Sequence, residues 1–247
     1  MLVIVSLHVI PAALFALWHG AAAYSLRGMA VFVDICLAVG NGFENLSILT
    51  GFPFGHYYFT GLMGPGLLRV PIFLGLAYMG MGDVSWTLGR LLVAGTRPRL
   101  AGSQIVTVPL AAGFVMVAWD LSMDPIWSTV MRAWIWLRGG AYFGVTVSNF
   151  LGWYLTVYVI YQLFAIYLRK RASDGGPVTA GHWCLAVVFY GVSALGNLVL
   201  LADGGSTVAT DATGAVWKVS SIVAASALVS ILVMGAFALL AWTAIDR

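Results

Sequence analysis

Long continuous runs of apolar residues dominate the chain, and a strict alternation of apolar and polar positions is absent. About 20 consecutive apolar residues suffice for a helix to cross a bilayer, whereas the strands of membrane barrels alternate with a period of two. The pattern therefore predicts an all-α fold, a polytopic bundle of about seven transmembrane helices in a single integral-membrane domain, residues 1–247. The expected spans are Leu2–Trp18, Met29–Leu49, Pro65–Trp86, Gly102–Met123, Thr146–Leu168, Trp183–Leu201 and Val216–Trp242.

Composition supports a membrane location and excludes several other classes. Hydrophobic residues make up 61% of the chain and charged residues 9%, whereas a soluble domain has about 25% charged residues. The net charge of +3 gives no support for nucleic-acid binding. Cys36 and Cys184 both fall within apolar runs, and His8, His19 and His182 are isolated in the sequence. We therefore expect no disulfide framework and no metal site.

Basic residues predict the orientation, because cytoplasmic loops carry an excess of Lys and Arg. Most of them fall near span ends on one side of the predicted bundle, and the contrary evidence is Arg132 and Arg138, in the loop after the fourth span. The N-terminus is then expected outside and the C-terminus in the cytoplasm, in a multi-pass protein of the plasma membrane. Residues 169–177 and 202–214 look like ordinary solvated loops. The basic residues on the cytoplasmic side are Arg27, Arg90, Arg97, Arg99, Arg169, Lys170, Arg171 and Arg247.

The connection between the second and third expected spans is too apolar for an ordinary loop. Residues 50–66 read TGFPFGHYYFTGLMGPG, with five glycines, two prolines and five aromatic residues. Irregular backbone is tolerated at membrane depth only where protein buries it or a cavity lines it. We therefore expect this segment to fold back into the protein and to be partly buried.

Several polar side chains fall near span ends that an alternating topology places on one side of the membrane. A charged group at the centre of a membrane helix costs about 2.5–3.5 kcal/mol on insertion scales, so such groups usually have a function. Span counting therefore predicts that these side chains meet the apolar loop at one depth. They are Glu44, Arg69, Asp120, Asp124 and Asn149.

Asp120 and Asp124 suggest a proton donor. Their spacing of four residues places both carboxyl groups on one face of a helix, which Pro125 is expected to end or bend. Structural roles remain open. Arg69 and Glu44 could form an ion pair between helices, the two aspartates could be solvated among lipid headgroups, and any single aromatic residue could be an interface anchor.

Several segments resemble the integral-membrane carotenoid biosynthesis proteins that include the CruF-type carotenoid 1,2-hydratases and the bisanhydrobacterioruberin hydratases. The resemblance is clear over residues 40–153, and it departs from the family at Thr146, where a proline is expected. The first matching block comprises Glu44-Asn45, the run TGFPFGHYY at 50–58 and Val70-Pro71. The second comprises Trp119-Asp120-Leu121, Asp124-Pro125, Trp134-Ile135-Trp136, Gly139-Gly140, Tyr142-Phe143-Gly144-Val145 and the run NFLGW at 149–153.

The resemblance implies addition of water across the terminal C1–C2 double bond of an acyclic carotenoid end group. Such a hydration needs a protonated acid, a stabilised tertiary cation and one admitted water, and burial beside a second carboxylate favours the protonated form of a carboxylic acid. The expected catalytic residues are Asp120, Asp124 and Glu44. The expected substrate- or cation-stabilising residues are Arg69, His56, Tyr57, Tyr58, Trp119, Trp134, Trp136, Tyr142 and Asn149.

The expected partners are the lipid bilayer and an apolar carotenoid or another polyprenyl substrate, and the oligomeric state is left open. No cofactor is expected, because hydration needs no redox chemistry and no nucleotide or flavin motif is visible. Two other functions remain open at this point. A membrane prenyl or terpene cyclase would use the same protonation, and a transporter or binding bundle for an apolar ligand would perform no chemistry.

Overall fold

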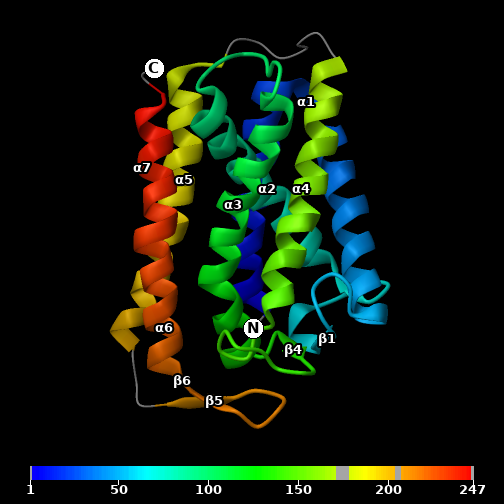
Figure 1. Ribbon diagram of the computed structural model, residues 1–247, viewed down its shortest axis with the longest axis vertical. Helices are drawn as coiled ribbons and strands as arrows, with labels where there is room; N and C mark the ends of the chain where they lie inside the picture. The colour runs from blue at the N-terminus through cyan, green and yellow to red at the C-terminus, as the bar shows by residue number, and fades with distance from the viewer. Residues whose placement is uncertain (1, 171–177, 204–206, 246–247) are drawn as a thin grey trace.

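The computed structural model describes residues 2–170, 178–203 and 207–245, which form an elongated helical bundle (Figure 1). The prediction of a mostly helical fold is confirmed, although three small two-stranded sheets accompany the helices. The α-helices are α1 (Leu2–Thr50), α2 (Ile72–Ala94), α3 (Gln104–Pro125), α4 (Val147–Lys170), α5 (Ala180–Val199), α6 (Val219–Leu228) and α7 (Gly235–Thr243). Tighter or wider helical turns form η1 (Gly61–Met63), η2 (Ile126–Val130), η3 (Leu200–Asp203) and η4 (Val229–Met234).

Helix α1 consists of two legs rather than one continuous rod. Ser25 has φ 66° and ψ 165°, which is incompatible with a helix. The chain turns back at this point, and Figure 1 shows the first leg rising from the N-terminus and the second descending at the side of the bundle. The first two expected spans therefore fall on separate legs, residues 2–24 and 26–50.

Among the described residues, five helices are long and apolar enough to cross a membrane, and the first of them contains both legs of α1. The expected count of seven spans is therefore not confirmed. Helix α2, which is buried along most of its length and carries Asp83 and Arg90, is not among the five. The candidate spans are Val3–Thr50, Gln104–Val130, Val147–Lys170, Ala180–Val199 and Val219–Thr243.

The expected third span, Pro65–Trp86, was placed too early in the chain. The strands β2 (Gly66–Leu67) and β3 (Val70–Pro71) pair with each other, and the helix begins only at Ile72. Proline is tolerated at the start of a helix, where its missing N–H leaves no hydrogen bond unmade. Apolarity alone cannot distinguish such a turn from the first turn of a helix.

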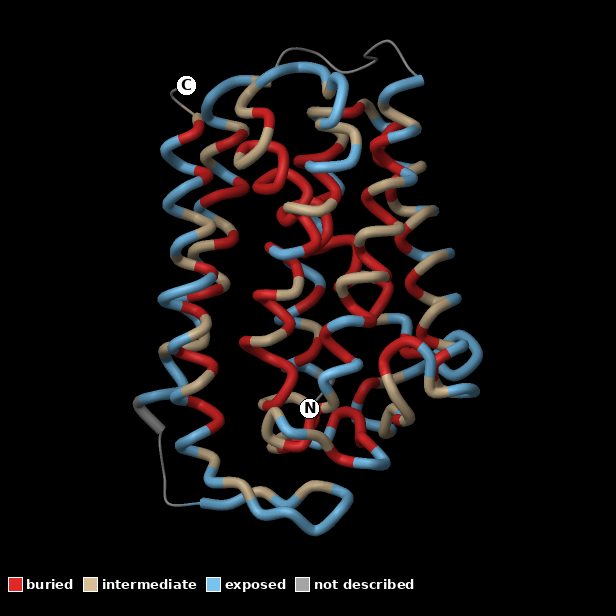
Figure 2. Tube along the Cα trace, viewed as in Figure 1, coloured by how far each residue is buried: buried red, intermediate tan, exposed pale blue. Residues whose placement is uncertain are grey.

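The core lies along α2, which packs between α1 and α3. Figure 2 shows buried residues concentrated on the central helices and exposed turns on the outer ones. Glycines permit the closest contacts, because a Cβ atom at Gly80 would lie 2.8 Å from the backbone of Ala12 and one at Gly89 would lie 2.7 Å from Ala112. Small residues at helix contacts are typical of membrane bundles.

One end of the bundle is closed by two irregular segments that pair with each other. Strand β1 (Tyr57–Phe59) runs antiparallel to β4 (Trp134–Trp136), with Tyr57 opposite Trp136 and Phe59 opposite Trp134. Phe54, Tyr57 and Met63 are buried, so the apolar loop does fold back into the protein as expected.

A β-hairpin of β5 (Val208–Thr210) and β6 (Val216–Lys218) extends below this end of the bundle (Figure 1). Residues 207–214 are therefore not an ordinary loop. Arg132 donates a hydrogen bond to the carbonyl of Thr210 at 3.1 Å, which ties the hairpin to the segment after η2. Residues 171–177 and 204–206 of the expected solvated loops, and Arg247, lie outside the described residues.

Candidate active site

A cavity of about 50 Å³ lies at the end of the bundle that the two irregular segments close. A single water needs about 10–15 Å³ on the same scale, so the cavity has room for several waters or for the end of a narrow chain. Its polar lining groups come from three helices and the apolar loop: His8, Glu44, Tyr57, Asp124 and Asn149. The remaining walls are mainly aromatic, with Phe54, Phe59, Phe73, Trp119, Trp127, Trp134, Trp136 and Trp153.

The two aspartates form one wall through a shared partner. Asp120 and Asp124 lie one turn apart on α3, and each is only 1% exposed. The side-chain amide of Asn149, at the start of α4, donates to Asp120 Oδ2 at 3.2 Å and also to Asp124 Oδ2. Trp134 Nε1 donates to Asp124 Oδ1 at 3.0 Å. Asp120 Oδ1 is buried without a hydrogen-bond partner in the described part of the chain.

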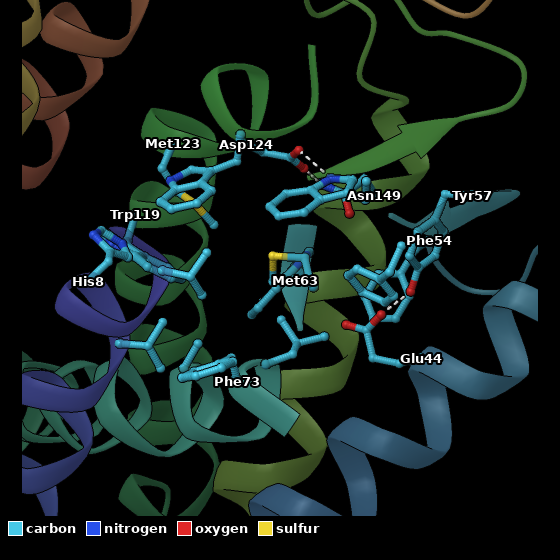
Figure 3. A pocket seen from close by; sticks show the side chains of 18 of the residues that line it. His8, Glu44, Phe54, Tyr57, Met63, Phe73, Trp119, Met123, Asp124 and Asn149 are labelled. Carbon is cyan, nitrogen blue, oxygen red and sulfur yellow. Dashed lines mark hydrogen bonds between the residues drawn. The ribbon is translucent and has the colours of Figure 1, made fainter. Parts of the chain in front are cut away.

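Glu44 forms a second wall with a different set of partners. It lies near the end of the second leg of α1 and is 3% exposed. The hydroxyl of Tyr78 donates to its Oε1 at 2.7 Å, and the hydroxyl of Tyr57 donates to its Oε2. Both carboxyl oxygens of Glu44 thus accept hydrogen bonds, and an ionised carboxylate can accept on both oxygens. Figure 3 shows Glu44 and Asp124 on separate sides of the pocket.

The structure brings most of the predicted site residues to this cavity. Tyr57, Trp119, Trp134 and Trp136 line it with Glu44, Asp124 and Asn149. Asp120 lies directly behind the cavity wall, linked to it through Asn149.

Four predicted residues lie elsewhere. Arg69 is exposed and forms no ion pair with a carboxylate among the described residues, so neither of its expected roles beside a carboxylate has geometric support. Tyr58 is 47% exposed, because successive residues of β1 point to opposite faces. His56 lines a separate hollow beside Arg138. The hydroxyl of Tyr142 donates to the carbonyl of Leu121 at 3.2 Å, which holds Tyr142 against α3 outside the cavity.

Sequence reasoning missed two polar residues of the site. Tyr78 lies on α2 and was not considered, although it contacts Glu44 directly. His8 appears isolated in the sequence, but it lies at the cavity with its ring 6.0 Å from that of Trp119 and 5.4 Å from that of Trp127. His8 is exposed and also lines the cavity, so it lies where the cavity meets the surface. Figure 3 shows it beside Trp119 at one side of the pocket. The signal that could have found His8 is a histidine near the start of the first expected span, on the side of the membrane where Asp120 was expected.

Comparison with known proteins gives one finding. A family model described as carotenoid biosynthesis protein matches residues 1–219, which include every residue of the cavity. No curated protein matches the chain, and no solved structure matches it.

Proposed function

The chain belongs to the carotenoid biosynthesis protein family, and from this premise we propose that it is a hydratase that adds water to the terminal double bond of an acyclic carotenoid or polyprenyl end group. Family membership supports a role in carotenoid biosynthesis, and the apolar helices support a membrane location. The observation that carries the proposal is the cavity itself. It is small and lined mainly by aromatic residues, and the carboxyl groups on its two walls accept hydrogen bonds from different donors.

The aspartate pair is proposed as the acid. Two carboxylates one helical turn apart in apolar surroundings repel each other, so the pair favours a state in which it shares one proton. Such a pair titrates as a unit. Asp124 faces the cavity and delivers the proton to C2 of the substrate, while Asn149 holds Asp120 and Asp124 together. General acid catalysis typically contributes about 10²–10⁴-fold to a rate.

Aromatic side chains are proposed to stabilise the tertiary cation that protonation leaves at C1. Trp119, Trp134, Trp136 and Trp153 all line the cavity. A cation over an aromatic face gains about 0.5–2 kcal/mol per contact. These rings provide such stabilisation without offering a nucleophile, so that the cation survives until water reaches it.

Glu44 is proposed to activate the water. The water oxygen bonds to C1, and one water proton passes to the carboxylate of Glu44, which Tyr57 and Tyr78 hold in place. The aspartate pair loses one proton and Glu44 gains one, and transfer of that proton from Glu44 back to the pair restores both walls for the next turnover. The net reaction is alkene plus water giving a tertiary alcohol. The substrate dissolves in the bilayer and needs no aqueous route to the site.

The test is product analysis by liquid chromatography and mass spectrometry after expression in a lycopene-producing host. We expect a new product heavier than lycopene by one water. The Asp120→Asn/Asp124→Asn double variant should make none of it. An isomer of unchanged mass would indicate a cyclase, and no product from a panel of acyclic polyprenyl substrates would indicate a transporter or binding protein.

A further inference from the structure

A second cavity lies far from the candidate active site, between the first leg of α1 and α5. It is open to the surface and has a volume of about 670 Å³. Helix α1 contributes Trp18 and Ala22 to its walls, and α5 contributes His182, Leu185 and Val188. Apart from the imidazole of His182, the side chains named here are apolar.

The ring of His182 packs against a buried pair formed by His19 and Asp83. Its ring stacks on that of His19 with the centroids 3.7 Å apart and the planes 11° apart. His19 Nδ1 lies 2.7 Å from Asp83 Oδ2, and His19 Nε2 donates to the backbone carbonyl of His182 at 3.2 Å. His19 and Asp83 are both completely buried or nearly so. The position of the His182 ring is therefore fixed by a buried polar cluster.

The ring nitrogens of His182 accept and donate no hydrogen bond within residues 2–170, 178–203 and 207–245, although the ring lines the open cavity. The cavity is mainly apolar, although Thr179 and Cys184 also line it. A fixed imidazole without a hydrogen-bond partner among the described residues fits a ligand that is apolar along its length and carries one hydroxyl group. A hydrogen bond to that hydroxyl would orient the ligand, as a few polar groups do in most apolar pockets.

The second cavity and the candidate active site lie on one stripe of the first leg of α1. His8 at the mouth of the site, Phe15, and Ala22 in the second cavity follow at intervals of seven residues, which places them on one helix face. At 1.5 Å per residue, His8 and Ala22 are about 21 Å apart along the helix. Between them, Phe15 stacks on Phe189 of α5 with ring centroids 4.5 Å apart. An aromatic surface thus lies between the two cavities.

We propose that this second cavity is a distal subsite for the far end of the same polyene substrate, with His182 as the residue that recognises a hydroxyl group there. The inference rests on the proposed function, because that reaction creates a tertiary alcohol at one end of the chain. A once-hydrated molecule that binds with its alcohol at His182 presents its unreacted end to Asp124. The subsite therefore favours substrates that already carry a hydroxyl at the far end.

Binding of the substrate in the second cavity is tested by blocking the cavity with a larger side chain. Val188 lines the cavity and is 49% exposed, whereas Val106 on α3 is 45% exposed and lines neither cavity. Purified protein from a lycopene-producing host is assayed for retained lycopene by absorbance. Val188→Trp should lower the retained lycopene several-fold, and the matched variant Val106→Trp should retain as much as the unmodified protein. Equal retention by all three would overturn the subsite.

Leu185→Trp provides a second obstruction of the same groove if Val188→Trp fails to elute as a monodisperse protein on size exclusion. This binding assay does not depend on turnover. If no hydrated product forms but Val188→Trp still loses lycopene, the proposed reaction fails and the subsite stands. If hydration occurs and lycopene retention is unaffected by both tryptophans in the groove, the reaction stands and the subsite fails.

The role of His182 is tested by His182→Phe, which preserves a ring for stacking on His19 and removes both ring nitrogens. The assay compares retention of lycopene with retention of its once-hydrated derivative. Loss of one hydrogen bond should lower the ratio of hydrated to unhydrated ligand about two- to tenfold. A ratio equal to that of the unmodified protein would remove His182 as the recognition residue, whereas a purely structural role would lower the retention of both ligands equally.

Discussion

The two carboxyl-bearing walls of the candidate active site differ in how their oxygens are satisfied. On the α3 wall, Asn149 donates to both aspartates and Trp134 donates to Asp124 Oδ1, whereas Asp120 Oδ1 has no partner among the described residues. On the α1 wall, each oxygen of Glu44 accepts a hydrogen bond from a tyrosine hydroxyl. The first wall therefore has two donor side chains for two carboxyl groups, and the second has two for one carboxyl group.

This difference assigns the proposed roles. Two adjacent carboxyl groups that share two donor side chains favour keeping one proton between them, whereas a single carboxylate with two donors of its own favours the ionised state. Environments that separate two titratable groups in this way are a common means of creating an acid and a base in one site. Each prediction below alters one wall and asks whether the other wall can take over its role.

The largest effect is expected for Asp124→Asn, which removes the acid that faces the cavity. Turnover should fall by at least about 10²-fold, the lower range for general acid catalysis, because an amide cannot supply the proton. The measurement is hydrated product per unit of purified protein. Asp34→Asn is the matched control, since Asp34 lies exposed on the second leg of α1. Full activity of Asp124→Asn would remove the acid from this wall.

Glu44→Gln should lower alcohol formation by a similar or smaller factor, again within about 10²–10⁴-fold, but with a different product pattern. The acid of the α3 wall is intact, so the cation still forms and is captured less often by water. It then loses a proton to give a double-bond isomer of unchanged mass. Mass spectrometry in deuterated water detects this route as deuterium in recovered isomers. A variant that makes neither alcohol nor labelled isomer would show that Glu44 acts before protonation.

Asn149→Leu should affect stability and turnover together, because it leaves two buried carboxyl groups without their shared donor. An unsatisfied buried polar group costs about 1–3 kcal/mol, so the melting temperature in detergent should fall. Asn197 is the matched control, because its side-chain amide donates hydrogen bonds to the hydroxyls of Ser122 and Ser230, which do not line the cavity. Asn197→Leu should lower stability and leave turnover per folded molecule near normal. Equal turnover losses in both variants would contradict a specific role of Asn149.

The place of the site was predictable, because it depends only on the order of the helices. Consecutive spans alternate in direction, so Glu44 at the end of one, Asp124 near the end of another and Asn149 at the start of a third reach the same end of the bundle. The apolar character of residues 50–66 likewise indicated that this loop is buried. Both inferences rest on properties of whole segments, so an error of a few residues in the predicted end of a helix does not change them.

The composition of the site was less predictable, because it depends on helix rotation and strand register. Tyr57 faces inward and Tyr58 outward only because β1 pairs with β4 in one register. Tyr78 reaches Glu44 through the rotation of α2, and His8 reaches the cavity through the rotation of the first leg of α1. Packing determines both rotations. Arg69 was misplaced because the helix starts after Pro71, so that Arg69 lies in an exposed turn beside Leu68, whose φ is 58°.

Tyr78→Phe should have the smallest effect, because it removes one of the two donors that supply Glu44 and leaves the carboxylate itself. A hydrogen bond to a charged group is worth about 1.5–3 kcal/mol, so if that loss appears in the transition state, turnover should fall by about ten- to a hundredfold. Tyr190→Phe is the matched control, since its buried hydroxyl donates to the carbonyl of Val115 at 2.8 Å, away from the cavity. Melting temperature and turnover are measured for both variants. If Tyr78→Phe resembles Tyr190→Phe in losing stability alone, the donors on the α1 wall are structural, and the contrast between the two walls no longer assigns the base.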